Sequence, residues 1–273
     1  MPKEYFTSEK LTDRVTRIRD VCGVGIYLVE GEDRACVIDT GHGLGNLRAY
    51  VEELTDKPVF VLLTHGHIDH AGGAALWEEV YMNPADQDLF KEHNSMKRRR
   101  EQLGEDPDSS WVPESDYVPE RTTPLLPLTD GQTFDLGGVS VKAIAAPGHT
   151  PGMMMILIPE ERIMLFGDAC GLEVLLFFED SSTVSEYLEM LQGIKTYEDQ
   201  YDRIIRNHGT CESPKELLDN VISCCEDVLN GTDAAQEIVW HGIPVLSARM
   251  VDEDHQRLDG RQGNILYIEE KRR

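Results

Sequence analysis

Three histidines and one aspartate fall within six consecutive positions of the chain, at His65, His67, Asp69 and His70. The apolar run 59–63 comes directly before them and predicts a strand that ends at the cluster. Imidazole nitrogens and carboxylate oxygens are the ligands that zinc and similar divalent ions take in proteins. The cluster therefore predicts a metal site at a strand end, in preference to a solvated polar loop.

The spacing within the cluster suggests how its members divide. Alternate residues of an extended chain point the same way, so we expect His65 and His67 to face one ion. The segment 71–79 predicts the helix that follows, which would leave Asp69 and His70 at the strand-to-helix bend, facing elsewhere. A second ion is expected there.

Three more candidate ligands, His149, Asp168 and His208, also follow apolar, strand-like runs. With these residues, the chain resembles the metallo-β-lactamase-fold superfamily of binuclear metallohydrolases over about residues 15–230. Within that superfamily it is more similar to the glyoxalase II-like branch than to the antibiotic-degrading enzymes. The resemblance implies a four-layer αββα sandwich, with the metal loops along one edge of two packed sheets.

The resemblance also implies a complete set of seven metal ligands. The first ion is held by His65, His67 and His149, the second by Asp69, His70 and His208, and Asp168 bridges both. In relatives, the residue matching Asp39 supports the metal loop from behind. Zinc is the expected metal at both positions, although oxygen ligands also admit iron or manganese.

Two departures from other relatives favour hydrolysis. His67 replaces the glutamate of the di-iron, flavin-partnered oxygen reductases, and Asp168 replaces the cysteine of one subclass of β-lactamases. Two ions bridged by Asp168 would lower the pKa of a shared water to about 7 and give a metal-bridging hydroxide. Asp69 is expected to act as the catalytic residue, orienting that hydroxide and passing a proton to the leaving group. The expected reaction is cleavage of an ester-like bond in a small molecule, such as a thioester or lactone.

The same motif is compatible with functions besides hydrolysis of such esters. Persulfide dioxygenases share the family resemblance and bind one iron through positions matching His65, His149 and Asp168. The presence of His70 and His208 favours two metals over a single iron. A weak, promiscuous β-lactamase activity and a catalytically idle sensor are also compatible with the motif.

Three residues outside the metal set are candidates for substrate contact. His42 lies in the turn after Asp39, which opens toward the metal edge in relatives, and we expect it to donate a hydrogen bond to substrate. The segment of about 93–123 lacks regular periodicity and predicts an inserted loop or lid. Within it, Trp111 and Tyr117 could supply an apolar wall.

Alternating patterns predict a single α/β domain over residues 1–273. The expected strands lie near 15–18, 25–29, 35–38, 59–63, 139–145, 153–158, 163–166 and 203–205, and the helices near 44–54, 184–196 and 214–229. The final section, about 232–273, predicts a hairpin extension with strands at 245–251 and 264–269. Such a hairpin could extend the sheet or form a homodimer contact.

Composition limits the classes of partner. The chain has 26 basic and 50 acidic residues, and its formal net charge of −24 argues against a nucleic-acid partner. No run of roughly 20 apolar residues predicts a membrane helix. Six cysteines without a Cys-x-x-Cys pair, and an N-terminus without an apolar stretch, predict a reducing, cytoplasmic location.

Overall fold

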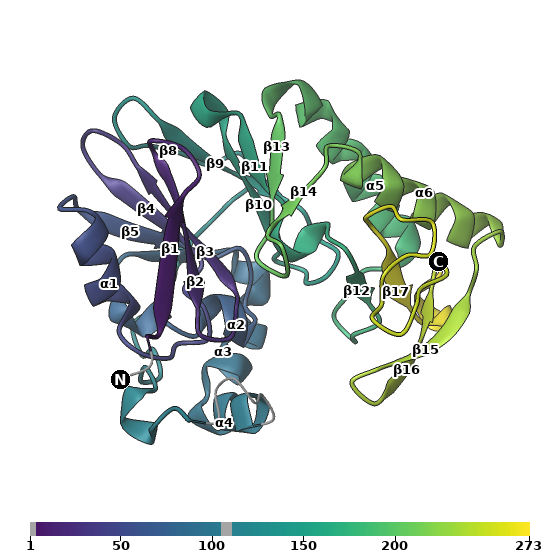
Figure 1. Ribbon diagram of the computed structural model, residues 1–273, viewed down its shortest axis with the longest axis horizontal. Helices are drawn as coiled ribbons and strands as arrows, with labels where there is room; N and C mark the ends of the chain where they lie inside the picture. Colours follow the sequence, from purple (N-terminus) through teal and green to yellow (C-terminus); the bar gives the residue numbers. More distant parts are fainter. Residues whose placement is uncertain (1–3, 105–110) are drawn as a thin grey trace.

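The computed structural model describes residues 4–104 and 111–273. Two β-sheets pack face to face and helices cover their outer faces (Figure 1). This arrangement confirms the predicted four-layer α/β sandwich. Residues 105–110, which belong to the predicted lid, lie outside the described residues.

The first sheet has seven strands that pair in chain order. They are β1 (Phe6–Lys10), β2 (Val15–Asp20), β3 (Gly25–Glu30), β4 (Ala35–Ile38), β5 (Val59–Leu62), β6 (Val80–Met82) and β7 (Leu126–Pro127). The pairs from β1 to β4 are antiparallel and those from β4 to β7 are parallel. The carboxyl ends of β4 and β5 therefore meet at one edge.

The second sheet has six strands in the order β14-β13-β11-β10-β9-β8. They are β8 (Thr133–Asp135), β9 (Ser140–Ala145), β10 (Met154–Ile158), β11 (Ile163–Leu165), β13 (Arg203–Ile205) and β14 (Glu212–Ser213). The parallel pair β11–β13 brings the loops after these two strands to the same edge. Those loops carry Asp168 and His208.

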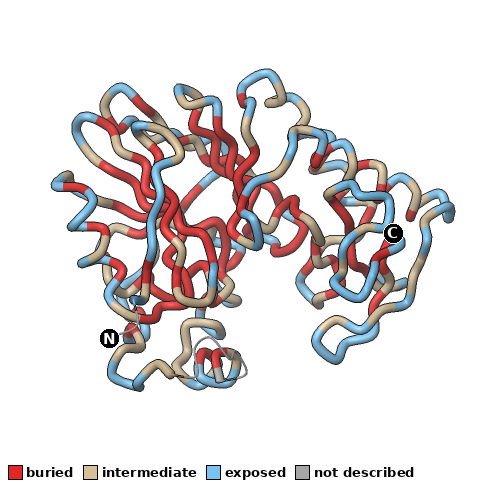
Figure 2. Tube along the Cα trace, in the orientation of Figure 1, coloured by how far each residue is buried: buried red, intermediate tan, exposed pale blue. Residues whose placement is uncertain are grey.

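Strand β10 shows how one apolar run serves two cores. Met154, Ile156 and Ile158 pack between the two sheets, whereas Met155 and Leu157 pack under the helices on the outer face. All five residues are buried because both faces of the strand are covered, as Figure 2 shows along the central strands. The methionine run is thus core.

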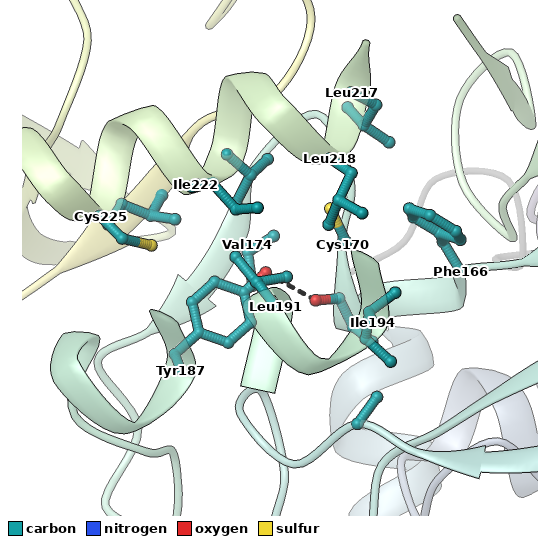
Figure 3. Close-up of a cluster of buried hydrophobic side chains, with 14 of the residues drawn as sticks. Phe166, Cys170, Val174, Tyr187, Leu191, Ile194, Leu217, Leu218, Ile222 and Cys225 are labelled. Atoms are coloured by element: carbon teal, nitrogen blue, oxygen red, sulfur yellow. Dashed lines mark hydrogen bonds between the residues drawn. The ribbon is translucent and has the colours of Figure 1, made fainter. Parts of the chain in front are cut away.

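The outer layers are helical. Helix α1 (Leu47–Leu54) packs Leu47 and Val51 against the first sheet. Helices α5 (Val184–Ile194) and α6 (Leu217–Asn230) cover the second sheet with a cluster that includes Tyr187, Leu191 and Leu218 (Figure 3). A capping box of Thr183 and Glu186 begins α5.

The segment predicted as an insertion contains α4 (Met96–Gly104), which follows α3 (Gln87–Asn94), and the short helix η3 (Glu114–Asp116). Arg99, in the basic run of α4, is fully buried and donates hydrogen bonds to the backbone oxygens of Val118, His42 and Gly43. The basic run of residues 97–100 is therefore only partly exposed to solvent. Part of it fastens α4 to the loop after β4.

Strand β12 and the C-terminal strands form a third sheet, in the order β12-β17-β16-β15, beside the sandwich (Figure 1). Its strands are β12 (Val174–Leu176), β15 (Gln236–Trp240), β16 (Ile243–Ser247) and β17 (Ile265–Tyr267). The predicted strand regions 245–251 and 264–269 overlap β16 and β17, while β15 was not predicted. In residues 4–104 and 111–273, no helix is long and apolar enough to cross a membrane.

Candidate metal centre

The loop after β5 brings the predicted cluster together by bending. The backbone bends at residues 64–66, and helix α2 (Ile68–Ala71) begins directly after His67. The expected extended geometry is therefore wrong, as is the helix over 71–79, which is replaced by α2 and the short helix η1 (Ala74–Leu76). Asp69 and His70 lie in the first turn of α2.

Three histidines form the first pocket. His67 Nδ1 lies 3.0 Å from His65 Nε2 and 3.0 Å from His149 Nε2. A tetrahedral ion about 2.0–2.1 Å from each nitrogen would place them roughly 3.3 Å apart. Burial lowers the pKa of His65, His67 and His149, and mutual repulsion among the rings adds to this. Neutral imidazoles are the form that binds a metal.

Two carboxylates and two histidines form the second pocket. His70 Nε2 lies 3.2 Å from His208 Nε2, 3.3 Å from Asp69 Oδ2 and 3.4 Å from Asp168 Oδ2. His208 Nε2 lies 3.3 Å from each of the same two oxygens. Asp168 Oδ2 is also 3.9 Å from His149 Nε2 of the first pocket, so its carboxylate stands between the two.

Charge within the second pocket favours ionised carboxylates. Burial would raise the pKa of Asp69 and Asp168, but His70 and His208 outweigh it and hold both values well below the ordinary range. Three nitrogens in one pocket, with two nitrogens and two oxygens in the other, suit two divalent ions. The described residues thus bring all seven predicted ligands into two adjoining groups.

Asp39 supports both pockets from behind. Its carboxylate accepts hydrogen bonds from His70 Nδ1 (2.9 Å), Asn207 Nδ2 (2.9 Å) and the backbone N–H of Thr64 (2.7 Å). The Thr64 hydroxyl also donates to Asp39 and accepts from His65 Nδ1 at 3.1 Å. Asp39 therefore fixes the ring orientation of one histidine in each pocket, directly or through Thr64.

Two supporting residues were not predicted. Asp86, fully buried, accepts from Gly66 N (3.0 Å), Thr150 Oγ1 (2.8 Å) and Gly152 N (2.5 Å), which ties the His65 loop to the His149 loop. Asn207, also buried, holds Asp39 and the backbone oxygen of Gly25. Asn207 stands next to a ligand in sequence, which is a usable signal, but nothing in the sequence near Asp86 marks it.

His42 lies beside the second pocket and pairs with Asp20. Its Nδ1 donates to Asp20 Oδ2 at 2.7 Å, and its backbone N–H donates to the same oxygen at 3.0 Å. Burial alone would lower the pKa of His42, but the carboxylates of Asp20 and Asp69 raise it. Because Nδ1 is occupied by Asp20, the predicted hydrogen bond from His42 to substrate would have to come from Nε2.

The other two candidates for substrate contact, Trp111 and Tyr117, pack against the N-terminal part of the chain. The ring of Trp111 packs 5.1 Å from that of Tyr5, and Tyr117 forms a β-bridge with Leu44 in the loop after β4. Their role in substrate binding stays a prediction.

His93 and Phe178 border the first pocket, although no sequence motif marks His93. The His93 ring stacks on His67 at 4.9 Å, and its Nδ1 accepts a hydrogen bond from Ile68 N. Burial and the neighbouring Arg98 lower the pKa of His93. Phe178, in the loop after β12, lies against His67 and His149.

Comparisons with known proteins show which family and which relatives the chain is similar to. A family model described as the metallo-beta-lactamase superfamily matches residues 19–199. The chain is 25% identical to the acyl-coenzyme A thioesterase MBLAC2 of Homo sapiens, over 76% of this chain and 71% of the relative. It is 24% identical to the "probable polyketide biosynthesis zinc-dependent hydrolase BaeB" of Bacillus velezensis, over 69% of this chain and 73% of the relative.

Solved structures agree on the fold. The chain superposes on a metallo-beta-lactamase from Pontibacter korlensis with a TM-score of 0.62 at 17% identity, covering 81% of this chain and 99% of that one. It also matches the sec-alkylsulfatase Pisa1 from Pseudomonas sp. with a TM-score of 0.64 at 16% identity, covering 83% of this chain and 42% of that one. At these identities the likeness concerns the fold alone.

Proposed function

Because the chain belongs to the metallo-beta-lactamase superfamily, we propose that it is a binuclear, zinc-dependent hydrolase of thioesters. That it is a metal-dependent hydrolase follows from the family and the two ligand groups. Zinc, the binuclear state and the thioester substrate are the proposal. One observation carries it: seven donor residues converge in two adjoining pockets that share Asp168.

Each pocket would hold one ion, with His65, His67 and His149 in the first and Asp69, His70 and His208 in the second. Asp168 would contribute to both. When bound, two such ions lower the pKa of water and polarise a carbonyl oxygen. Hydrolysis then needs no nucleophile from the protein.

The chain's own residues supply orientation and proton transfer. The Asp69 side chain is 18% exposed and ionised, so its carboxylate can take a proton from the attacking water and return it to the leaving sulfur. His42, held by Asp20, would donate a hydrogen bond from Nε2 to the substrate. Water and thioester thus yield one carboxylic acid and one thiol.

The choice of thioesters over other activated carbonyls rests on relatives. Two proteins similar to this chain are named thioesterases, MBLAC2 and the "atrochrysone carboxyl ACP thioesterase nsrC" of Aspergillus novofumigatus, the latter 28% identical over 59% of this chain and 44% of the relative. A place near the glyoxalase II-like branch, a cytoplasmic location and the absence of nucleic-acid or membrane partners are parts of the same proposal.

Metal content tests the proposal first. We expect about two zinc ions per chain by elemental mass spectrometry of protein purified without added metal or chelator. Hydrolysis is then measured on a panel of thioesters, lactones and β-lactams. One iron per chain with oxygen uptake on a persulfide would instead identify a dioxygenase and contradict the proposal.

Substitution of the shared ligand sharpens the test. Asp168→Ala should lower metal content to about one ion or less per chain and reduce turnover by roughly 10³-fold, because both pockets lose a ligand. Circular dichroism should remain that of the wild type. The exposed Asp254→Ala is the matched control, and full activity in Asp168→Ala would refute the shared-ligand assignment.

A further inference from the structure

A path of aromatic rings leads from the first metal pocket into the C-terminal sheet. The Phe178 ring centroid lies 6.2 Å from His67 and 5.9 Å from His149, edge to face in both cases. The Trp240 ring lies 6.1 Å from Phe178 and 5.4 Å from Phe177. Three rings thus continue the surface of the metal ligands toward the end of β15.

The hairpin β15–β16 fixes Trp240 in this place. Trp240 pairs with Ile243 across a two-residue turn, His241-Gly242, whose φ angles of 44° and 83° match the turn type that hairpins favour. Because side chains alternate along a strand, Ile238 and Trp240 share the face that packs with Phe177, Val245 and Leu266. Val239, on the opposite face, is 65% exposed.

A hydrogen bond also links the third sheet to His149, one of the proposed metal ligands. The backbone oxygen of Leu175 in β12 accepts a hydrogen bond from His149 Nδ1 at 3.2 Å. Phe178 follows β12 by two residues, so the strand that orients His149 also places the first ring beside it. The position of the rings relative to the pocket is therefore set by β12.

Exposure distinguishes these rings from an ordinary core. Phe177 is buried, whereas Phe178, which contacts His67 and His149, and Trp240, which contacts Phe178, are both partly exposed. Partly exposed aromatic rings next to a reactive centre offer apolar contact area to a ligand. Trp240 also lies beyond residues 19–199, the part that matches the family model, so the family match does not account for this ring.

We propose that Phe178 and Trp240 form a wall that binds the apolar acyl group of the substrate while its carbonyl lies at the metal centre. This inference rests on the thioesterase function proposed above and narrows its substrates to thioesters of medium-length or aromatic acids. Each methylene buried on such a wall improves binding about fourfold. Acetyl thioesters, too short to reach Trp240, are poor substrates.

Binding of the acid product tests the wall without turnover. Isothermal titration of the zinc-loaded protein with octanoate and acetate should give at least a tenfold tighter dissociation constant for octanoate. Trp240→Ala and Phe178→Ala should each reduce that ratio about tenfold. Trp240→Phe and Phe178→Leu, which keep apolar surface, should retain most of it, and Val239→Ala on the other face of β15 should leave it unchanged.

Kinetics on octanoyl and acetyl thioesters complete the experiment. We expect Trp240→Ala to raise KM for the octanoyl substrate about tenfold and to change that for acetyl less than twofold. An unaltered octanoate preference in both alanine variants would overturn the wall. The same conclusion holds if Trp240→Ala changes the sedimentation coefficient while the preference stays unaltered, because the hairpin would then form a contact between copies of the chain. A wild-type protein that hydrolyses no thioester but binds octanoate through Trp240 would overturn only the proposed function.

Discussion

Asp39 has an unusual backbone conformation, and its carboxylate accepts several hydrogen bonds. Its φ of 62° lies in the left-handed region, which asparagine and aspartate tolerate better than most residues. Asp39→Asn therefore keeps the backbone and the size but exchanges one acceptor oxygen for a donor. The new NH2 group must then face an N–H of Thr64, His70 or Asn207, each of which donates a hydrogen bond to Asp39, so that two donors oppose each other.

We predict that Asp39→Asn weakens metal binding by about 10- to 100-fold, since supporting residues of this kind hold the ligand rings in place. Competition with a chromophoric zinc chelator measures the affinity of both pockets. Asp33→Asn, an exposed residue just before β4, is the control. Wild-type affinity in Asp39→Asn would mean that the rings are oriented by their other contacts.

Local spacing in the sequence predicts which residues the fold gathers into the two ligand groups. His65, His67, Asp69 and His70 stand in one short segment, and His149, Asp168 and His208 each follow an apolar run, so residue type and position both mark them. Asp86 has no such mark, because its role depends on three partners that only the folded chain brings near. Phe178 and Trp240 were missed for the same reason.

At the scale of elements, Asp86 joins two loops from different sheets. Removing its carboxylate in Asp86→Ala leaves the N–H groups of Gly66 and Gly152 and the hydroxyl of Thr150 buried without an acceptor. Such losses cost about 1–3 kcal/mol each before relaxation, so we predict a destabilisation of roughly 3 kcal/mol. The first pocket, built from both loops, should also bind its metal more weakly than the second.

Urea unfolding and stepwise zinc titration measure the two effects. Asp86→Asn keeps one acceptor oxygen and should be less severe, which gives a folded variant for the titration. The exposed Asp88→Ala, two residues along in α3 and paired with Lys91, serves as the control. Equal weakening of both pockets would argue that Asp86 stabilises the fold without favouring the first pocket.

Helix α4 offers two neighbouring arginines with opposite surroundings. Arg99 is buried and donates to three backbone oxygens, and burial lowers its pKa to about 10. Arg100 is exposed and pairs with the exposed Glu114. We predict that Arg99→Met costs roughly 3 kcal/mol and that Arg100→Met costs close to nothing.

Thermal unfolding of the two variants checks the difference. Because Arg99 holds the backbone of His42, Arg99→Met should also lower turnover, and Arg100→Met should not. Similar unfolding temperatures for the two variants would contradict a fastening role for Arg99.

Periodicity predicted many of the regular elements, but it missed strands β1 and β15 and helix α3. The strand predictions at 35–38 and 203–205 coincide with β4 and β13, because both are short apolar runs bounded by polar turns. Strands β7, β12 and β14 have two or three residues, too few to show an alternating pattern. Helix α2 begins three residues earlier than expected because Asp69 and His70 stand in its first turn in place of the apolar residues that mark a helix.

For the whole molecule, the formal net charge of −24 sets the field that an approaching substrate meets. Coenzyme A thioesters carry several negative charges on their phosphates, so the protein as a whole repels them. Such repulsion lowers the rate of encounter and is relieved by salt. A neutral thioester of N-acetylcysteamine with the same acyl group does not experience it.

We predict that kcat/KM for an octanoyl-coenzyme A substrate rises several-fold between about 10 mM and 150 mM salt, over which the screening length falls from roughly 30 Å to 8 Å. The N-acetylcysteamine thioester should change less than twofold over the same range. Steady-state kinetics in a chloride series, with zinc held constant, compare the two. A fall in kcat/KM for the coenzyme A substrate would show that positive charge near the site, from the bound metals and Arg98 beside His93, outweighs the field of the whole chain. Since both substrates share one acyl group and one reaction, their difference isolates the electrostatic contribution from the chemistry.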